Sequence, residues 1–90
     1  MKRHATYYVY MVRSRHGTYY TGYTHDLDKR IELHNNGRGA KYLKGKGPVK
    51  LVFAREYRYY KNALKGERKI KRMPRKAKGK LIEAYQRSKK

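Results

Sequence analysis

The 90-residue chain is strongly basic, with 26 Lys and Arg residues against 6 Asp and Glu residues and a formal net charge of +20. This length suits one hydrophobic core, so we expect a single domain over residues 1–90, with its core at about 6–85 and a frayed basic tail. The absence of cysteine excludes disulfides, thiolate metal sites and cysteine nucleophiles. Because no apolar run reaches the roughly 18–20 residues of a membrane span and no signal-peptide pattern is seen, we expect a cytoplasmic protein without a membrane partner.

The excess of positive charge predicts a polyanionic partner. Self-repulsion destabilises such a chain, and a nucleic acid relieves it because Lys and Arg displace condensed counterions. Anionic lipid is a second candidate, but no segment pairs a basic face with Trp, Phe or Leu. Disorder is a third, and eleven tyrosines argue against it. We therefore expect a nucleic acid as the partner, and charge alone leaves DNA and RNA both open, because it recognises the phosphate and does not distinguish the sugar.

The first third of the chain predicts a β-hairpin. Residues 7–12 form an unbroken apolar and aromatic run, which is typical of a central strand covered on both faces. A turn at 14–17 and a second strand at 18–24 follow. A connecting loop with an odd number of residues would set Tyr10 directly opposite Tyr20, whereas an even number would not. The residues alone leave both registers open.

A helix is predicted after the hairpin. Its N-cap is Asp26 or Thr24, and it ends at Gly37. The face predicted to meet the core carries Leu27, Ile31 and His34, with Arg30 on or beside it.

The second half predicts a loop, a strand and two helices. A loop rich in Gly and Lys at 37–48 precedes a strand at 49–54. A helix from about Tyr59 is broken by Pro74, which suits the first turn of the next helix. The order ββαβαα predicts an α/β (α+β) fold with helices on a sheet of about three strands, the third of undetermined position. The packing face of the final helix is predicted to contain Ala77, Leu81, Ala84 and Tyr85.

Two charged residues fall on helix faces predicted to meet the core. Glu67 lies within an apolar stripe, where a carboxylate needs a cation, a hydrogen-bond donor or a metal. A structural ion pair with a neighbouring Lys or Arg, or a place at the edge of the stripe, is the alternative. Gly66 disfavours a helix and indicates a close approach to the backbone there. Arg30 either pairs with Asp26 one turn earlier, extends along the helix surface or meets a phosphate with its planar fork.

The histidines and the basic loop are less specific. His34 alone is more typical of a capping or half-buried residue than of a ligand, and the other histidines lack the spacing of a zinc site. The loop has no Gly-Lys-Ser/Thr ending and is therefore not a P-loop. We interpret it as a flexible arm on the nucleic-acid backbone, with a merely solvated loop as the alternative. Its contacting residues would be Arg38, Lys41, Lys44 and Lys46.

These residues together could supply a base, a phosphate clamp and a ligand for a hard cation, which suffice for metal-assisted phosphodiester hydrolysis. In chain order they stand in Tyr8-Val9-Tyr10, Tyr20-Thr21-Gly22-Tyr23-Thr24, Asp28-Lys29-Arg30-Ile31 with His34, and Glu67. Their order and spacing over about residues 6–82 resemble the GIY-YIG nuclease superfamily, and most closely its small stand-alone YhbQ-like bacterial proteins. The basic loop matches that branch as well.

The resemblance implies a three-stranded antiparallel sheet flanked by helices, and a role for each matching residue. Tyr10 and Tyr20, the latter in the motif closed by Gly22, would position and deprotonate the attacking water. Arg30 would steady the phosphate charge, and His34 would lie near the site. One divalent ion, Mg²⁺ or Mn²⁺, would be held by Glu67. We expect the positive field of the chain to lower the pKa of Tyr10 so that it can act as a base at neutral pH.

The predicted function is a divalent-metal-dependent DNA endonuclease, in repair or recombination. We expect a monomer that is nucleoid-associated when bound to DNA, with specificity from substrate shape or from a partner protein. The first motif lacks glycine, no Asn follows Glu67, and we expect no second DNA-binding domain. A non-catalytic module that binds DNA or RNA on the same scaffold is therefore the alternative, and a ribosome-associated basic protein is a third.

Overall fold

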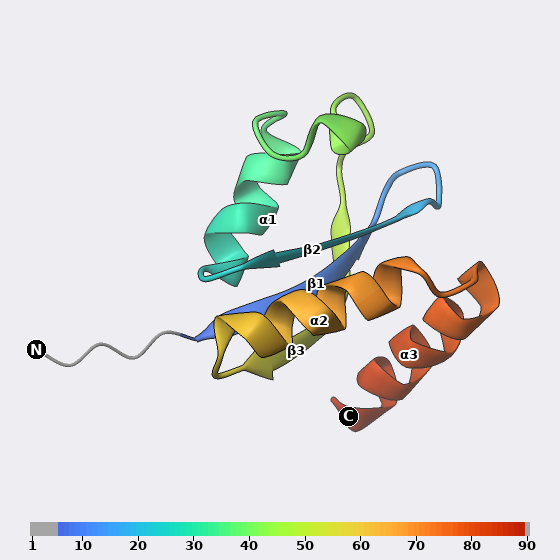
Figure 1. Cartoon of the computed structure of the whole chain (residues 1–90). Helices are drawn as coiled ribbons and strands as arrows, with labels where there is room; N and C mark the ends of the chain where they lie inside the picture. Colours follow the sequence, from blue (N-terminus) through green and yellow to red (C-terminus); the bar gives the residue numbers. More distant parts are fainter. Residues whose placement is uncertain (1–5, 90) are drawn as a thin grey trace, which may run out of the picture.

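The computed structural model describes residues 6–89, which form a three-stranded antiparallel sheet of order β2-β1-β3 with helices on both faces (Figure 1). The predicted fold class and the order ββαβαα are confirmed, apart from one added turn of 3₁₀ helix, η1. No helix within residues 6–89 has the length and apolar character to cross a membrane. The elements are β1 (Tyr7–Arg13), β2 (Tyr19–Thr24), α1 (Leu27–Asn35), η1 (Lys41–Leu43), β3 (Lys50–Tyr57), α2 (Tyr60–Lys71) and α3 (Arg75–Ser88).

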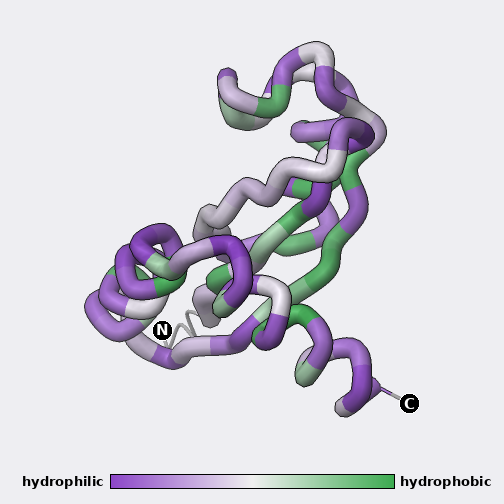
Figure 2. The backbone as a smooth tube through the Cα atoms, turned by 90° about the vertical axis from the view of Figure 1, so that its right-hand side faces the viewer, coloured by the Kyte–Doolittle hydropathy of each residue, from purple (hydrophilic) through white to green (hydrophobic). Residues whose placement is uncertain are grey.

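The central place of β1 is confirmed. Four consecutive residues, Val9 to Val12, are fully buried, because side chains that alternate between the two faces are covered on both sides. β3 pairs antiparallel with the free edge of β1, so the hairpin and β3 share one central strand. Figure 2 shows the hydrophobic residues gathered mainly on the strands, with the helices and loops largely hydrophilic.

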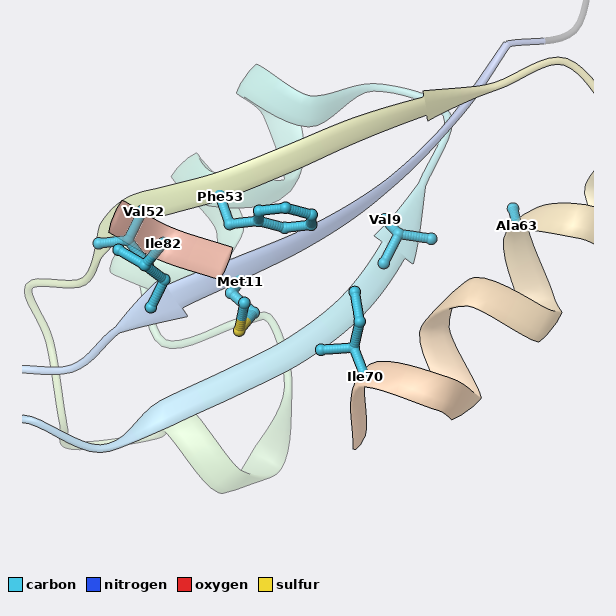
Figure 3. Close-up of a cluster of buried hydrophobic side chains, with 7 residues drawn as sticks. All are labelled: Val9, Met11, Val52, Phe53, Ala63, Ile70 and Ile82. Atoms are coloured by element: carbon cyan, nitrogen blue, oxygen red, sulfur yellow. The ribbon is translucent and has the colours of Figure 1, made fainter. Parts of the chain in front are cut away.

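The sheet separates two hydrophobic clusters. One face packs against α2 and α3 through Val9, Met11, Val52, Phe53, Ala63, Ile70 and Ile82 (Figure 3). The other face packs against α1 and the loop that follows it, through Tyr10, Val12, Leu43 and Val49 with Leu27 and Ile31 at the margin. Tyr10 therefore points toward α1, away from α2 and α3.

The hairpin register differs from the expected facing pair. The loop, residues 14–18, is odd in number, yet Tyr10 lies opposite Gly22 and Val12 lies opposite Tyr20. Tyr10 and Tyr20 share one face but are offset by two residues along the strands, with the Met11–Thr21 pair between them. The reason is the centre of the turn, which falls one residue later than a Tyr10–Tyr20 pair requires.

The ends of the helices follow the predicted signals with small corrections. Asp26 caps α1, since its side chain accepts a hydrogen bond from the backbone N–H of Lys29 at 3.2 Å. Gly37, with a φ of +77°, follows the C-cap of α1. Pro74 is the N-cap of α3 instead of lying in its first turn.

Two other predicted boundaries shift. The third strand was predicted over 49–54, but β3 runs from Lys50 to Tyr57 because it pairs along the whole of β1. In α3 the buried residue is Ile82, whereas Ala84, predicted on the packing face, is exposed. Of the predicted frayed tail, residues 87 and 88 belong to the last turn of α3, and residue 90 lies outside the described residues.

Candidate active site

Tyr10 lies at the centre of the candidate site, and its position explains Gly22. Tyr10 is fully buried, and Gly22 faces it across the hairpin. A Cβ atom on residue 22 would lie 2.7 Å from the Tyr10 hydroxyl oxygen and 3.1 Å from the ring of Tyr20. Only glycine leaves room for the two tyrosines there, which gives the closing glycine of the second motif a steric reason.

His34 holds the Tyr10 hydroxyl from α1. Its Nε2 lies 2.8 Å from the Tyr10 oxygen, and its Nδ1 accepts a hydrogen bond from the backbone N–H of Ala40 at 3.2 Å. Because a backbone N–H can only donate, Nδ1 carries no proton in this arrangement. Nε2 then carries the proton of the neutral ring and donates to the Tyr10 oxygen. A buried hydrogen-bond donor therefore faces the oxygen that was predicted to act as a base.

The ring of Tyr20 completes an aromatic cluster around this hydrogen bond. Its centroid lies 6.4 Å from that of Tyr10 and 5.5 Å from that of His34, the latter contact being edge-on. On its other side Tyr20 stacks on Tyr42, with 6.1 Å between the centroids. Tyr42 was not predicted as a site residue, because its contact with Tyr20 depends on how the loop folds.

The expected fall in the pKa of Tyr10 is wrong. Burial raises the pKa of Tyr10 to about 12, and the neighbouring Arg30 opposes the rise without cancelling it. Burial, helped by the Arg30 charge, lowers the pKa of His34 to about 4, in agreement with the neutral ring that its hydrogen bonds require. Near pH 7 the resting site thus holds a neutral phenol and a neutral imidazole.

Of the alternatives for Arg30, the pair with Asp26 is not formed, because Asp26 is occupied as the cap of α1. The Nε of Arg30 is buried and has no hydrogen-bond partner among residues 6–89. A buried donor left unpaired costs about 1–3 kcal/mol, and more when it is charged. This half-buried guanidinium beside Tyr10, with its Nε–H unpaired, is suited to receive an anion, for which the guanidinium fork is well shaped.

Glu67 is buried on α2, as its place in the apolar stripe predicted, with 8% of its surface exposed. Lys71, one turn later, lies 3.2 Å from a Glu67 carboxylate oxygen, so the predicted structural ion pair is present. The Glu67 charge contributes to the raised pKa of Tyr10, which places the two groups within electrostatic range of each other. The close approach predicted at Gly66 is made by the Tyr57 ring and hydroxyl.

The acidic and histidine side chains limit what kind of metal could bind. Within residues 6–89, no three of them cluster as a preformed cage. Mg²⁺ commonly binds through one or two carboxylates, with water and substrate phosphate as its other ligands. A single buried carboxylate such as Glu67 fits that mode and does not fit a structural zinc site.

The basic loop is folded against the site and is not the flexible arm we expected. Leu43, in η1, is buried in the α1-side cluster, and Gly39 lies so close to His34 that a Cβ atom would overlap the imidazole. Lys46 places its ammonium 3.8 Å from the centre of the Tyr42 ring, in cation–π geometry. The remaining predicted contact residues, Arg38, Lys41 and Lys44, are exposed.

The structure therefore brings most of the predicted site residues together. Tyr10, Tyr20 and His34 are in mutual contact, and Gly22 lies against both tyrosines. Arg30 and Glu67 both influence the pKa of Tyr10. The four basic loop residues lie on the segment that covers His34.

Comparison with known proteins agrees with this geometry. A family model described as the GIY-YIG catalytic domain matches residues 6–80. A UPF0213 protein of Staphylococcus saprophyticus is 47% identical over 76 residues, covering 84% of this chain and 93% of that protein. One from Oceanobacillus iheyensis is 42% identical over 77 residues, covering 86% and 90%.

A solved structure is also similar. The solution NMR structure of a UPF0213 protein from Bacillus halodurans is 38% identical, with a TM-score of 0.59 over 88% of this chain and 84% of that one. Fold, motif residues and relatives agree, and the chain belongs to the GIY-YIG family, among its UPF0213 proteins.

Proposed function

We propose that this member of a nuclease family is a divalent-metal-dependent DNA endonuclease that acts in repair or recombination. The observation that carries the proposal is the buried, unpaired Nε of Arg30 beside the hydrogen-bonded Tyr10–His34 pair. A half-buried guanidinium with an unpaired Nε–H next to a potential base is unfavourable for a purely structural site. It is favourable where a phosphate group binds and reacts.

Each residue then has a task in phosphodiester hydrolysis. Arg30 binds the attacked phosphate and stabilises the negative charge that develops on its oxygens. Tyr10, in its phenolate form, accepts a proton from the attacking water and becomes a neutral phenol as the oxygen of that water attacks phosphorus. Before this transfer, His34 Nε2–H stabilises the phenolate by donating to the Tyr10 oxygen. Tyr20 supports the orientation of Tyr10 and of the water. Since the resting pKa of Tyr10 is about 12, only a small fraction of the protein has this base ready near neutral pH.

Glu67 would hold the divalent ion, which we propose to be Mg²⁺ or Mn²⁺. When bound, such an ion supplies Lewis-acid stabilisation to the phosphoryl and leaving oxygens. Lys71 competes for the same carboxylate, so the ion pair between them must open or be shared.

The test is cleavage of branched, nicked and duplex DNA by the purified protein with Mg²⁺ or Mn²⁺. We expect metal-dependent cleavage that is lost in Glu67→Gln and in Tyr10→Phe, with DNA affinity retained in Tyr10→Phe. Lys71→Gln is the matched control, because it breaks the same ion pair but keeps the carboxylate. Loss of activity in Lys71→Gln equal to that in Glu67→Gln would show that the ion pair, and not a metal ligand, is what matters.

A second candidate function is a non-catalytic nucleic-acid-binding module. The Glu67–Lys71 pair favours it, because it gives the carboxylate a structural partner without any metal. Tight, salt-sensitive binding of DNA or RNA by the wild type without cleavage in any metal would support this reading over the nuclease.

A further inference from the structure

A basic groove lies at the far end of β1 from the N-terminus, and it shares no residue with the candidate active site. It is formed by the end of β1 and the start of the turn (residues 13–15), the segment leading into β3 (residues 48 and 50–52), and Gln86 of α3. Its volume is about 510 Å³. Such a volume is within the range of small-ligand sites, but the lining is unusual for one, since it is rich in cations.

The charges around the basic groove repel one another. Arg13, Arg15 and Lys50 line it, and no Asp or Glu does. The sheet register sets Arg13 directly opposite Lys50, and like charges in that position are destabilising. None of the three has a salt-bridge partner among residues 6–89. The fold thus holds three cations around the groove with no acidic residue to neutralise them. An anion bound between them would reduce their repulsion and stabilise the fold.

The turn that carries Arg15 and follows Arg13 is held by side-chain hydrogen bonds. Ser14 is buried, and its hydroxyl oxygen accepts hydrogen bonds from the backbone N–H groups of His16 and Thr18 at 3.1 and 3.2 Å. The positions of the neighbouring residues 13 and 15 are therefore set by the turn and not by a mobile loop.

The basic groove is also continuous with the basic loop over the active site. The backbone N–H of Arg15 donates to the carbonyl of Lys46 at 3.0 Å, which joins the turn to that loop. Arg13 follows Tyr10 by three residues of β1, so its side chain lies on the opposite face of the sheet, toward α3. A nucleic-acid strand that contacts both places would pass around the end of the sheet, over the turn and the basic loop.

We propose that the basic groove binds the phosphodiester backbone of the nucleic acid, where the strand passes from the active site around the end of the sheet. This rests on the nucleic-acid-binding part of the proposed function but not on cleavage. We expect the occupant to be a polymer, because the cations of the groove and those of the basic loop form one continuous positive surface, joined where Arg15 meets Lys46. A chain of phosphates can contact such a surface along its length, whereas a single small anion cannot. The groove fixes the position of the protein along the nucleic acid and contributes affinity, whereas Arg30 binds the phosphate that is attacked.

The test compares a long with a short DNA oligonucleotide, about 20 and about 6 nucleotides, by fluorescence anisotropy in EDTA, where no metal supports cleavage. The variant is Arg13→Gln/Lys50→Gln. Its matched control is Arg58→Gln/Lys61→Gln, which removes the same charge about 26 Å away, beyond the other end of β3. All four positions are exposed, and thermal melting checks that both variants are folded.

We expect the groove variant to bind the long oligonucleotide at least about tenfold more weakly at 0.1 M salt, because each phosphate contact contributes close to that factor. The slope of log affinity against log salt should fall by about 1.4–1.8, the value for two lost contacts. The preference for the long over the short oligonucleotide should fall with it, whereas the control variant should keep the wild-type preference. In phosphate-free buffer without DNA, relief of the Arg13–Lys50 repulsion should raise the melting temperature of the groove variant.

Two results would overturn the inference. Equal weakening in the groove and control variants would mean that only net charge matters. If the groove variant bound anionic phospholipid vesicles more weakly than the wild type but bound DNA equally well, the groove would be assigned to a membrane surface instead. Because these measurements need no cleavage, an inactive wild type would refute the nuclease and leave the groove to be judged by binding alone.

Discussion

Replacing Gly22 by Ala tests the steric core of the site. The added Cβ would lie 2.7 Å from the Tyr10 hydroxyl oxygen and 3.0 Å from Cζ of the same ring. Tyr10 cannot easily withdraw, because it is fully buried and its hydroxyl is held by His34. Overpacking of this kind costs about 1–3 kcal/mol of unfolding free energy. For a domain of this size, each kcal/mol corresponds to a fall of about 4–8 °C in melting temperature.

The matched control is Gly79→Ala in α3, where an added Cβ meets no atom within 4 Å. Alanine in a helix interior is favoured over glycine by roughly 0.5–1 kcal/mol, so this variant should melt at a higher temperature. Urea and thermal unfolding of both variants should therefore move in opposite directions. A Gly22→Ala protein within about 0.5 kcal/mol of the wild type, the usual range for inert surface changes, would refute the close packing of Tyr10 over residue 22.

Three further predictions concern the charged and titrating groups. If Tyr10 is the base, cleavage should rise about tenfold per pH unit through neutral pH, since the base form grows as pH approaches its pKa of about 12; a plateau already at pH 7 would contradict this. His34 is neutral in the folded protein, where its pKa is about 4, compared with about 6.5 in the unfolded chain. Its contribution to the free energy of unfolding is therefore complete above pH 6.5 and is lost as the pH falls through 4. The unfolding free energy should fall by up to about 3 kcal/mol over that window, and His34→Gln should show less of this fall in parallel acid titrations. Arg30→Met should leave the melting temperature in phosphate-free buffer equal or higher, because it removes an unpaired buried donor, while weakening cleavage; a clear loss of stability would show that Arg30 is structural.

The parts of the fold that follow from local pattern were predictable from the sequence. The unbroken run before Arg13 indicated a strand covered on both sides, and the cap at Asp26 is a local hydrogen bond. The hairpin register was not predictable, because it depends on where the turn closes, which the Ser14 hydroxyl bonds help to determine. The edge of β1 that takes β3 was equally open on the residues alone, and only the family resemblance indicated it.

The candidate site divides in the same way. Helical spacing placed Glu67 and His34 on buried faces, and the structure agrees. Tyr42 could not be found from spacing, since it contacts Tyr20 only through the folded loop. The basic groove likewise arises from the Arg13–Lys50 register, which no segment of sequence contains by itself.

The wrong expectation for the pKa of Tyr10 has a physical cause that bears on how the site works. Most of the 26 cations are on the surface, where water and salt screen them, whereas the loss of solvent around Tyr10 acts at the hydroxyl itself. The same burial holds the Tyr10 oxygen against His34 and Gly22. A site that positions this oxygen accurately therefore also raises its pKa, which makes it a weaker source of phenolate at neutral pH. The site can combine accurate placement with a lower pKa only with charges close to the oxygen. Arg30 is the nearby cation in the resting protein, and a cation held by Glu67 would add a second one. Divalent metal should therefore shift the pH–rate profile toward lower pH as its concentration rises, and it should not do so in Glu67→Gln.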